Sequence, residues 1–494
     1  MIPLGSIPTH YAGLQGGRTA VVHDDDAMDW RALDAAANRF ANALTARGVG
    51  QDDVVTLSMP NGNQVVAAAF GVWKVGATPN MTPSKTPASE MRALLSVVRP
   101  KLAICADPDL AAAIGGVDPS FADGASDAAA VVKIARHWKA MPSGGSTGTP
   151  KVIIDHRPAA FAPDTPVLGI PKNGVILNPG PLYHNAPFTM SIMALLRGST
   201  VVGMRRFDAL EALRLIDVHR VQFVTFVPTM MHRIWRLPDE VRASYDLSSL
   251  ERVWHMAAPM PPWLKRVWID WLGPSRIWEL YGGTENTGST ILSGEEWLRK
   301  PGSVGRPTSG AQIRAQDEDG APLAPGELGE LYFMPAGGTR STYHYLGAVA
   351  REDAEGWDSL GDFGWVDADG YVFLADRRTD MILSGGANIY PAEVEAALTE
   401  HPDVDGAVVI GLPDDDLGAR VHAVVRLTAG IDSEQPLATL AEWLTTRLAR
   451  YKIPRSFEAT DEPLRDDAGK VRRSALRAAR LDDSNWRSPR VDRF

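Results

Sequence analysis

A nine-residue segment, residues 143–151, has the composition of a phosphate-binding loop. Its sequence is Ser143-Gly144-Gly145-Ser146-Thr147-Gly148-Thr149-Pro150-Lys151. Glycines let backbone N–H groups approach an anion closely, hydroxyls add further donors, and the terminal lysine adds a full positive charge. The segment therefore predicts a site for phosphate groups.

Two other glycine-containing motifs could point to a different chemistry for this chain. The nucleotide-hydrolase pattern G-x-x-x-x-G-K-[ST] fails at Gly469-Lys470, because Leu464 stands five residues before the glycine and Val471 follows the lysine. The run 144–148 matches the serine-hydrolase elbow G-x-S-x-G, with Ser146 as nucleophile. That elbow requires a helix directly after the serine, whereas the β-branched run 152–154 favours a strand. The hydrolase is kept as a distant alternative.

A second cluster of polar side chains follows the apolar run 276–278. The segment is Glu279-Leu280-Tyr281-Gly282-Gly283-Thr284-Glu285. Ligands of open α/β sheets bind at the carboxyl ends of strands, so Tyr281 is placed to stack on a base and Thr284 to donate to phosphate. Glu285 offers the oxygen ligands that Mg²⁺ prefers. Further along, Asp362 follows a glycine and suits a ribose hydroxyl pair.

The composition limits the classes of protein to which the chain can belong. The 494 residues exceed one typical domain, and 45% hydrophobic with 22% charged residues is ordinary for a globular enzyme. A net charge of −10 argues against a nucleic-acid partner. The single cysteine, Cys105, excludes an internal disulfide and fits a cytoplasmic location. We find neither a signal peptide nor an apolar run long enough for a transmembrane segment.

Hydrophobic periodicity predicts an α/β fold. Helices are expected over 29–47 and 64–76, and strands over 54–57, 102–105 and 221–226, which favours mostly parallel sheets. Strands over 329–333 and 370–374 indicate a more antiparallel region. Beyond the charged run 376–380, a helix from Pro391 and strands over 407–410 and 422–425 predict a small α+β unit.

Taken in order, these motifs resemble those of the adenylate-forming superfamily, which includes acyl-CoA synthetases. The resemblance runs from about Trp30 to Arg473 and includes the loop 143–151, the segment 281–285, Gly361-Asp362, Asp376-Arg377 with 385–391, and Gly469-Lys470. It implies a large N-terminal domain of α/β subdomains with mixed, mostly parallel sheets, residues 1–377, and a small mobile α+β C-terminal domain, residues 378–494. Thr379 would be the hinge, where the family more often has Asp or Lys.

The resemblance also implies a reaction and its residues. A carboxylate attacks the α-phosphate of ATP, and the acyl-AMP then passes its acyl group to coenzyme A. Lys470 would be the bridging cation, with His184 and Glu285 as further catalytic residues. Glu285 would hold Mg²⁺, with Thr147 as a second ligand left open. The expected ATP- and AMP-binding residues are Ser143, Gly144, Gly145, Ser146, Thr147, Gly148, Lys151, Tyr281, Gly282, Thr284, Asp362 and Arg377.

The acyl pocket predicted by the same resemblance is mostly apolar. Its residues are His184, Ala257, Ala258, Leu280, Gly282 and Gly283. Residues 183–190 contain no acid to pair a substrate ammonium, which argues against an amino-acid substrate. We therefore expect an apolar acid of the fatty, aryl or steroid type. Transfer of the acyl group to an amine, giving an amide, stays open as an alternative, and so does a homodimer.

Overall fold

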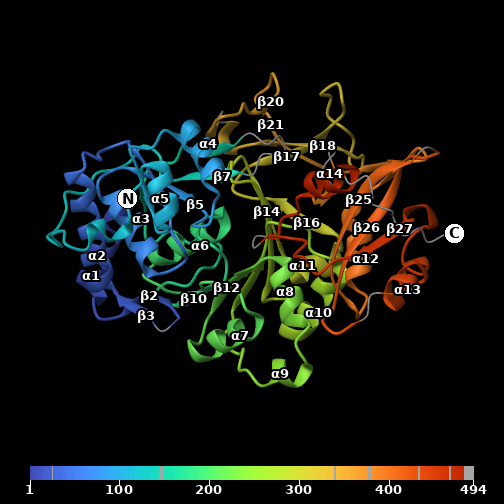
Figure 1. Cartoon of the computed structure of the whole chain (residues 1–494), viewed down its shortest axis with the longest axis horizontal. Coiled ribbons are helices and arrows are strands. Elements are labelled where there is room, and N and C mark those ends of the chain that lie inside the picture. Colours follow the sequence, from blue (N-terminus) through green and yellow to red (C-terminus); the bar gives the residue numbers. More distant parts are fainter. Residues whose placement is uncertain are drawn as a thin grey trace.

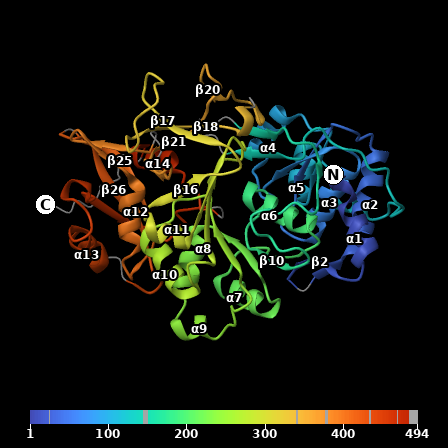
Figure 2. The same ribbon diagram turned by 180° about the vertical axis from the view of Figure 1, so that it is seen from behind.

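The computed structural model describes residues 1–24, 26–143, 150–338, 341–375, 380–414, 416–431, 434–466 and 469–482. The N-terminal part of the chain forms the larger portion, and the last hundred or so residues form a smaller lobe at its side (Figures 1 and 2). Predicted residues 144–148, Arg377 and Thr379 lie outside the described residues. The predicted boundary at 377/378 falls in the same gap and stays a prediction. No helix in the described ranges is long and apolar enough to cross a lipid bilayer.

A six-stranded sheet carries the two ends of the glycine-rich loop. Its strand order is β19-β8-β7-β5-β4-β6. The bounds are β4 Val54–Ser58, β5 Thr78–Thr82, β6 Leu102–Cys105, β7 Ala140–Ser143, β8 Lys151–Asp155 and β19 Tyr343–Leu346. Strands β7 and β8 pair antiparallel with Ser143 opposite Lys151. The loop therefore connects two strands of a hairpin, and no helix follows it. This contradicts the serine-hydrolase elbow, which requires a helix at that point.

A fourteen-stranded sheet forms the centre of the described chain. Its parallel half contains β2 Thr19–His23, β11 Thr200–Gly203, β10 Val175–Asn178, β12 Phe223–Phe226, β13 Arg252–His255 and β14 Ile277–Gly282. Its antiparallel strands are β3 Asp26–Asp29, β15 Ser289–Ser293, β16 Ser303–Pro307, β17 Gln312–Gln316, β18 Gly329–Met334, β20 Arg351–Glu352, β21 Asp358–Val366 and β22 Val372–Leu374. The predicted parallel sheets and later antiparallel region are both confirmed.

Helices cover these sheets through apolar faces. In α2, Trp30–Ala46, the residues Leu33, Phe40 and Leu44 are buried, and the carboxylate of Asp29 caps the first turn by accepting from the Ala32 N–H. Every residue of the helix α3, Asn63–Lys74, is buried except Gln64. The other helices are α1 Ile7–Gln15, α4 Ala88–Val98, α5 Pro108–Ile114, α6 Asn185–Leu196, α7 Ala209–Val218, α8 Pro228–Trp235, α9 Asp239–Ala243, α10 Pro262–Leu272 and α11 Gly294–Arg299.

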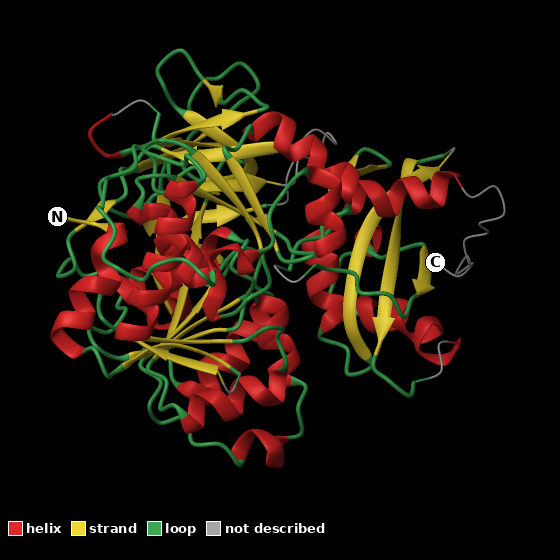
Figure 3. Cartoon of the chain, turned by 60° about the vertical axis from the view of Figure 1, so that its left-hand side comes forward, coloured by secondary structure: helices red, strands yellow, loops and turns green. Residues whose placement is uncertain are grey.

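The C-terminal lobe has its own sheet and its own buried core (Figure 3). Strands β25 Val404–Asp414 and β26 Gly418–Leu427 pair antiparallel, and β27 Ser456–Ala459 pairs parallel with β26. The other elements are the hairpin β23 Ile382–Ser384 and β24 Ala387–Ile389, and helices α12 Pro391–Thr399, α13 Glu434–Thr445 and α14 Arg473–Asp482. The predicted α+β unit is confirmed, with Pro391 at the first position of α12.

Candidate active site

One cleft of about 3500 Å³ collects every predicted site residue that the structure describes. It opens at the carboxyl ends of the parallel strands β10, β12, β13 and β14, where ligands of α/β sheets bind. The predicted residues that line it are Ser143, Lys151, His184, Ala257, Ala258, Leu280, Tyr281, Gly282, Gly283, Thr284, Glu285, Asp362 and Lys470. Residues of the C-terminal lobe, including Gly469 and Lys470, form part of the same wall.

Tyr281 and Asp362 meet on one side of the cleft although 81 positions separate them. Tyr281 lies in β14, Asp362 lies in β21, and the tyrosine hydroxyl donates to Asp362 Oδ2 at 2.8 Å. The preceding Gly361 has a φ of +80°, which lets the strand bend where the carboxylate reaches the cleft. An aromatic ring beside a carboxylate suits an adenosine, as the sequence predicted, and these two roles stay predictions.

Glu285 is a buried carboxylate just beyond β14. Its Oε1 accepts from the hydroxyl of Tyr345 at 2.7 Å, and its backbone carbonyl accepts from Thr342 Oγ1 at 2.7 Å. Burial and the charge of Glu285 raise the pKa of the Tyr345 phenol. A methyl group placed on Gly283 would lie 2.6 Å from Glu285 Oε2 and from Leu360 Cδ1, so a larger residue here would require these side chains to shift. Sequence reasoning missed Tyr345, which comes from the distant strand β19.

The surroundings of Glu285 fit a magnesium ion. Mg²⁺ in nucleotide sites is held by one or two carboxylates together with the phosphates, so one buried carboxylate is a sufficient protein ligand. Within the described ranges, no group of three or more acidic or histidine side chains has metal-binding geometry. Nearby, Lys151 begins β8 and its ammonium lies 4.3 Å from the centre of the Tyr345 ring. The cation of Lys151 and the carboxylate of Glu285, the predicted metal ligand, thus both contact Tyr345.

The predicted acyl wall is built from the segments that follow β10 and β13. His184 is the N-cap residue of α6, and its ring lies 4.6 Å from that of Tyr183. Ala257 has a φ of +72°, which is uncommon for a residue with a side chain and marks a sharply bent backbone. The bend turns Ala257 and Ala258 toward the cleft. Their small side chains leave room there for a bulky ligand.

Lys470 reaches this wall from the C-terminal lobe. It ends a tight turn in which the Lys470 N–H donates to Asp466 Oδ1 at 2.9 Å and the Gly469 N–H donates to the Asp466 carbonyl at 2.8 Å. Gly469 has a φ of +76°, and a methyl group on it would lie 3.4 Å from Thr229 Oγ1 and 3.8 Å from the methyl of Ala258. The turn therefore rests directly on the predicted acyl wall.

A buried carboxylate fixes this turn within its lobe. Glu395 of α12 accepts from Arg465 Nη2 and from Arg473 Nη2, each at 2.6 Å, and from the Val409 N–H at 2.9 Å. Arg465 also donates to the carbonyl of Gly469 at 3.1 Å, next to Lys470. Two arginines on one carboxylate therefore hold both ends of the lysine-bearing turn. Sequence reasoning missed this clamp, because its members are up to 78 positions apart.

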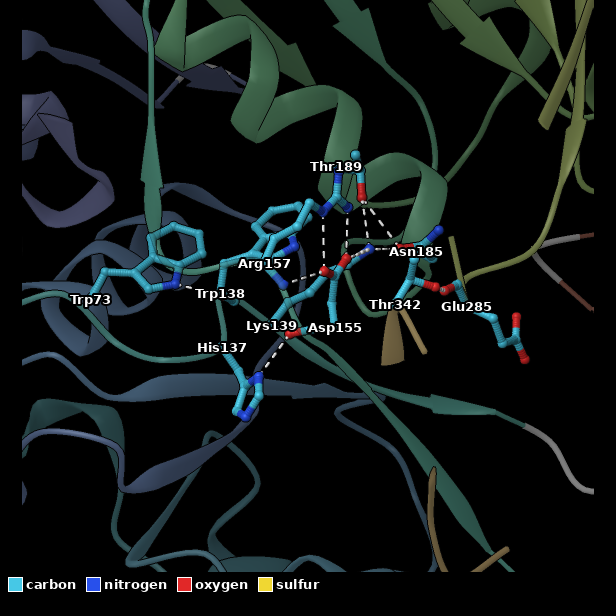
Figure 4. A network of polar contacts seen from close by, with 10 residues as sticks. All are labelled: Trp73, His137, Trp138, Lys139, Asp155, Arg157, Asn185, Thr189, Glu285 and Thr342. Atoms are coloured by element: carbon cyan, nitrogen blue, oxygen red, sulfur yellow. Dashed lines mark hydrogen bonds and ion pairs between the residues drawn. The ribbon is translucent and has the colours of Figure 1, made fainter. Parts of the chain in front are cut away.

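A buried lysine, Lys139, lies behind the first turn of α6 (Figure 4). It is paired with Asp155 at 4.0 Å, and Arg157 binds the same carboxylate at 2.6 and 3.0 Å. Burial lowers the pKa of Lys139 to about 7, although the charges of Asp155 and Glu285 oppose that shift. Sequence reasoning missed Lys139, because it follows Arg136-His137-Trp138 directly before β7 and its neighbours give no signal of burial.

The chain matches known families and proteins over nearly its whole length. The AMP-binding enzyme family matches residues 9–343, and the AMP-binding enzyme C-terminal domain matches residues 393–470. A feruloyl-CoA synthase of Amycolatopsis sp is 32% identical over 495 residues, which covers 96% of this chain and 98% of the relative. A long-chain-fatty-acid–CoA ligase of Mycobacterium tuberculosis is 30% identical over 478 residues, which covers 92% and 93%.

Solved structures of a CoA synthetase also match the chain over nearly its whole length. The o-succinylbenzoate CoA synthetase of Bacillus subtilis, in complex with its acyl-adenylate intermediate, has a TM-score of 0.80 to this chain at 25% identity. The match covers 98% of this chain and 99% of that chain. The same enzyme in complex with ATP and a magnesium ion has a TM-score of 0.78 at 26% identity, with 95% and 99% covered.

Proposed function

The chain belongs to the AMP-binding enzyme family, and we propose that it is an ATP-dependent carboxylate–CoA ligase. Its acid would be apolar, of the fatty, aryl or steroid type. The observation that carries the proposal is that Lys470, Glu285 and the Tyr281–Asp362 pair all line one cleft. The named relatives act as CoA ligases, which favours coenzyme A over an amine as acceptor.

The first step joins two anions and therefore needs positive charge. An oxygen of the acid attacks the α-phosphorus of ATP, the bond to the bridging oxygen breaks, and pyrophosphate leaves. Lys470 is positioned at the acyl wall to neutralise the acid and the α-phosphate together, which is electrostatic stabilisation by a preorganised cation. Tyr281 and Asp362 orient the adenosine, and Lys151 adds charge beside the departing pyrophosphate. Magnesium bound at Glu285 supplies charge that offsets the phosphates.

The second step transfers the acyl group. The thiol of coenzyme A loses its proton and attacks the acyl carbon, and AMP leaves with both electrons of the carbon–oxygen bond. His184 borders the cleft beside the predicted acyl wall and is our candidate for holding the thiol or its proton. Rotation of the C-terminal lobe about a hinge at Thr379, which would withdraw Lys470 between the steps, belongs to this proposal. So do the boundary at 377/378, a cytoplasmic location and a homodimer.

A pyrophosphate-release assay over fatty, aryl and steroid acids, with and without coenzyme A or an amine, tests the proposal. We expect ATP- and Mg²⁺-dependent pyrophosphate release with at least one apolar acid, and an acyl-CoA product when coenzyme A is present. An amide formed without coenzyme A would favour the alternative acceptor. Absence of pyrophosphate release with every acid would refute the ligase proposal.

A further inference from the structure

The cleft wall formed by α6 has a polar position supported from behind by Lys139. The amine of Lys139 donates to Asn185 Oδ1 and lies 3.3 Å from Thr189 Oγ1, and both partners belong to the first turns of α6 (Figure 4). Lys139 is only 2% exposed. Asn185 directly follows His184 and is partly exposed, and both Asn185 and Lys139 are among the residues that line the cleft.

Helix stability does not explain a lysine at this place. A positive charge near the amino end of a helix opposes the helix dipole, and burying an amine costs free energy unless it is paired. Asp155 supplies the paired charge at 4.0 Å, but Arg157 already binds that carboxylate through two hydrogen bonds. An apolar side chain would fill the space behind α6 without these costs. The contact with Asn185 is therefore the specific consequence of having lysine at position 139.

That contact fixes the orientation of the Asn185 amide. A lysine amine carries hydrogens to donate whether it is charged or neutral, so the amide turns its oxygen toward Lys139. Thr189 Oγ1 lies 3.3 Å from the same amide oxygen, which reinforces the orientation. The amide nitrogen with its two N–H groups must then lie on the side away from Lys139. Lys139, Asn185 and Thr189 all line the cleft, and the N–H groups of the Asn185 amide are directed away from the two side chains that contact its oxygen.

We infer that Asn185 is a specificity-determining residue whose amide nitrogen donates to an oxygen atom on the body of the acid substrate, and that Lys139 is its positioning residue. The inference rests on the proposed function and narrows it to acids that carry a hydroxyl, keto or ether oxygen. Of the neighbouring side chains of α6 on this wall, Ala186, Met190 and Met193 are apolar, and the hydroxyl of Thr189 is directed to the Asn185 oxygen. A donor held in a fixed orientation beside such side chains discriminates between an acid with an oxygen in reach and the same acid without it.

The test compares matched acids. Pyrophosphate release is measured for decanoate and for decanoates bearing a hydroxyl or keto group at successive carbons, and for cinnamate against its hydroxylated forms. We expect the wild-type kcat/KM to favour the oxygenated acid at one position by about tenfold or more. Asn185→Leu removes the donor, and the isosteric Asn185→Asp replaces it with an acceptor while keeping the size. Both variants should abolish the preference.

Lys139→Met tests the positioning role. It should weaken the preference by raising KM for the oxygenated acid more than it lowers kcat, because the amide is then free to turn. A preference that survives in Asn185→Leu, or a wild-type enzyme that favours no oxygenated acid, would overturn the inference. Isothermal titration calorimetry with the same acid pairs measures the effect of Asn185 on acid binding alone, without catalysis. If no acid gives pyrophosphate release, the ligase proposal is refuted. The role of Asn185 is still decided by the ratio of the dissociation constants for the oxygenated and the unsubstituted acid.

Discussion

Replacing Arg236 with methionine tests what holds the C-terminal lobe in its observed orientation. Arg236 follows α8 in the larger part of the chain, and its guanidinium donates to four main-chain carbonyls of the C-terminal lobe. These are the carbonyls of Thr399, His401, Pro402 and Val404, at 2.8–3.1 Å. They belong to the end of α12 and the turn that follows, where unpaired carbonyls and the negative end of the helix dipole attract a cation.

The size of the effect follows from these contacts. One hydrogen bond from a charged donor contributes about 1.5–3 kcal/mol, but the four are not additive, because water replaces part of the set when the arginine is removed. We take about 3 kcal/mol for the whole contact, which corresponds to about a hundredfold change in the equilibrium between this orientation and others. Since the Gly469-Lys470 segment lies beside Ala258 of the predicted acyl wall in this orientation, Arg236→Met should slow acyl-AMP formation about ten- to a hundredfold.

Measuring the two half-reactions separately isolates this effect. Acyl-AMP formation is followed by pyrophosphate exchange, and thioester formation is followed from supplied acyl-AMP and coenzyme A. Arg236→Met should impair the first and leave the second near its wild-type rate. Arg214→Met on α7 is the matched control, because Arg214 pairs with Glu211 on the same exposed helix face. Equal loss in both half-reactions, or no loss in either, would refute the reasoning.

Three further substitutions test the site. Lys470→Ala should reduce acyl-AMP formation on the order of 10²–10³-fold and retain thioester formation from supplied acyl-AMP; equal loss of both steps contradicts its role. Glu285→Gln should raise the Mg²⁺ concentration that gives half-maximal pyrophosphate release, and an unchanged Mg²⁺ dependence would exclude it as the ligand. Burial lowers the pKa of Lys139 to about 7 from 10.5, so above pH 7 the unfolded chain holds a proton that the folded protein has released. The free energy of unfolding of the wild type should therefore rise by about 2 kcal/mol relative to Lys139→Met between pH 7 and pH 9, measured by urea unfolding; a constant difference between the two proteins would show that Lys139 stays charged.

The sequence predicted those site residues that lie in short, recognisable motifs. Tyr281, Glu285 and Asp362 stand in or just after strands, and the alternation of strands and helices placed those strand ends at one edge of a sheet. Lys470 was recognisable only through the resemblance, since a lone Gly-Lys pair has no distinguishing local pattern. The structure brings all four to one cleft. It also shows that a strand follows the glycine-rich loop, as the β-branched run 152–154 indicated.

The supporting contacts could not be predicted from one sequence. Tyr345 meets Glu285 from a strand 60 positions away, and Arg236 meets the carbonyls of α12 across more than 160 positions. Such pairs depend on how elements pack, and neither partner carries a local pattern that points to the other. Lys139 is a further case, because it stands between Arg136-His137-Trp138 and the first residue of β7, and its local sequence does not mark it as buried.

Two sets of contacts determine where Lys470 lies, one within the C-terminal lobe and one between the lobes. Inside the lobe, Glu395 holds Arg465 and Arg473 at 2.6 Å, so the lysine-bearing turn is fixed to α12. Between the lobes, Arg236 holds the other end of that helix through main-chain carbonyls. A displacement of α12 relative to α8 would therefore carry Lys470 with it through Arg465 and Arg473. Movement of the predicted catalytic lysine into or out of the cleft would then require that the contacts between Arg236 and the carbonyls at the end of α12 break.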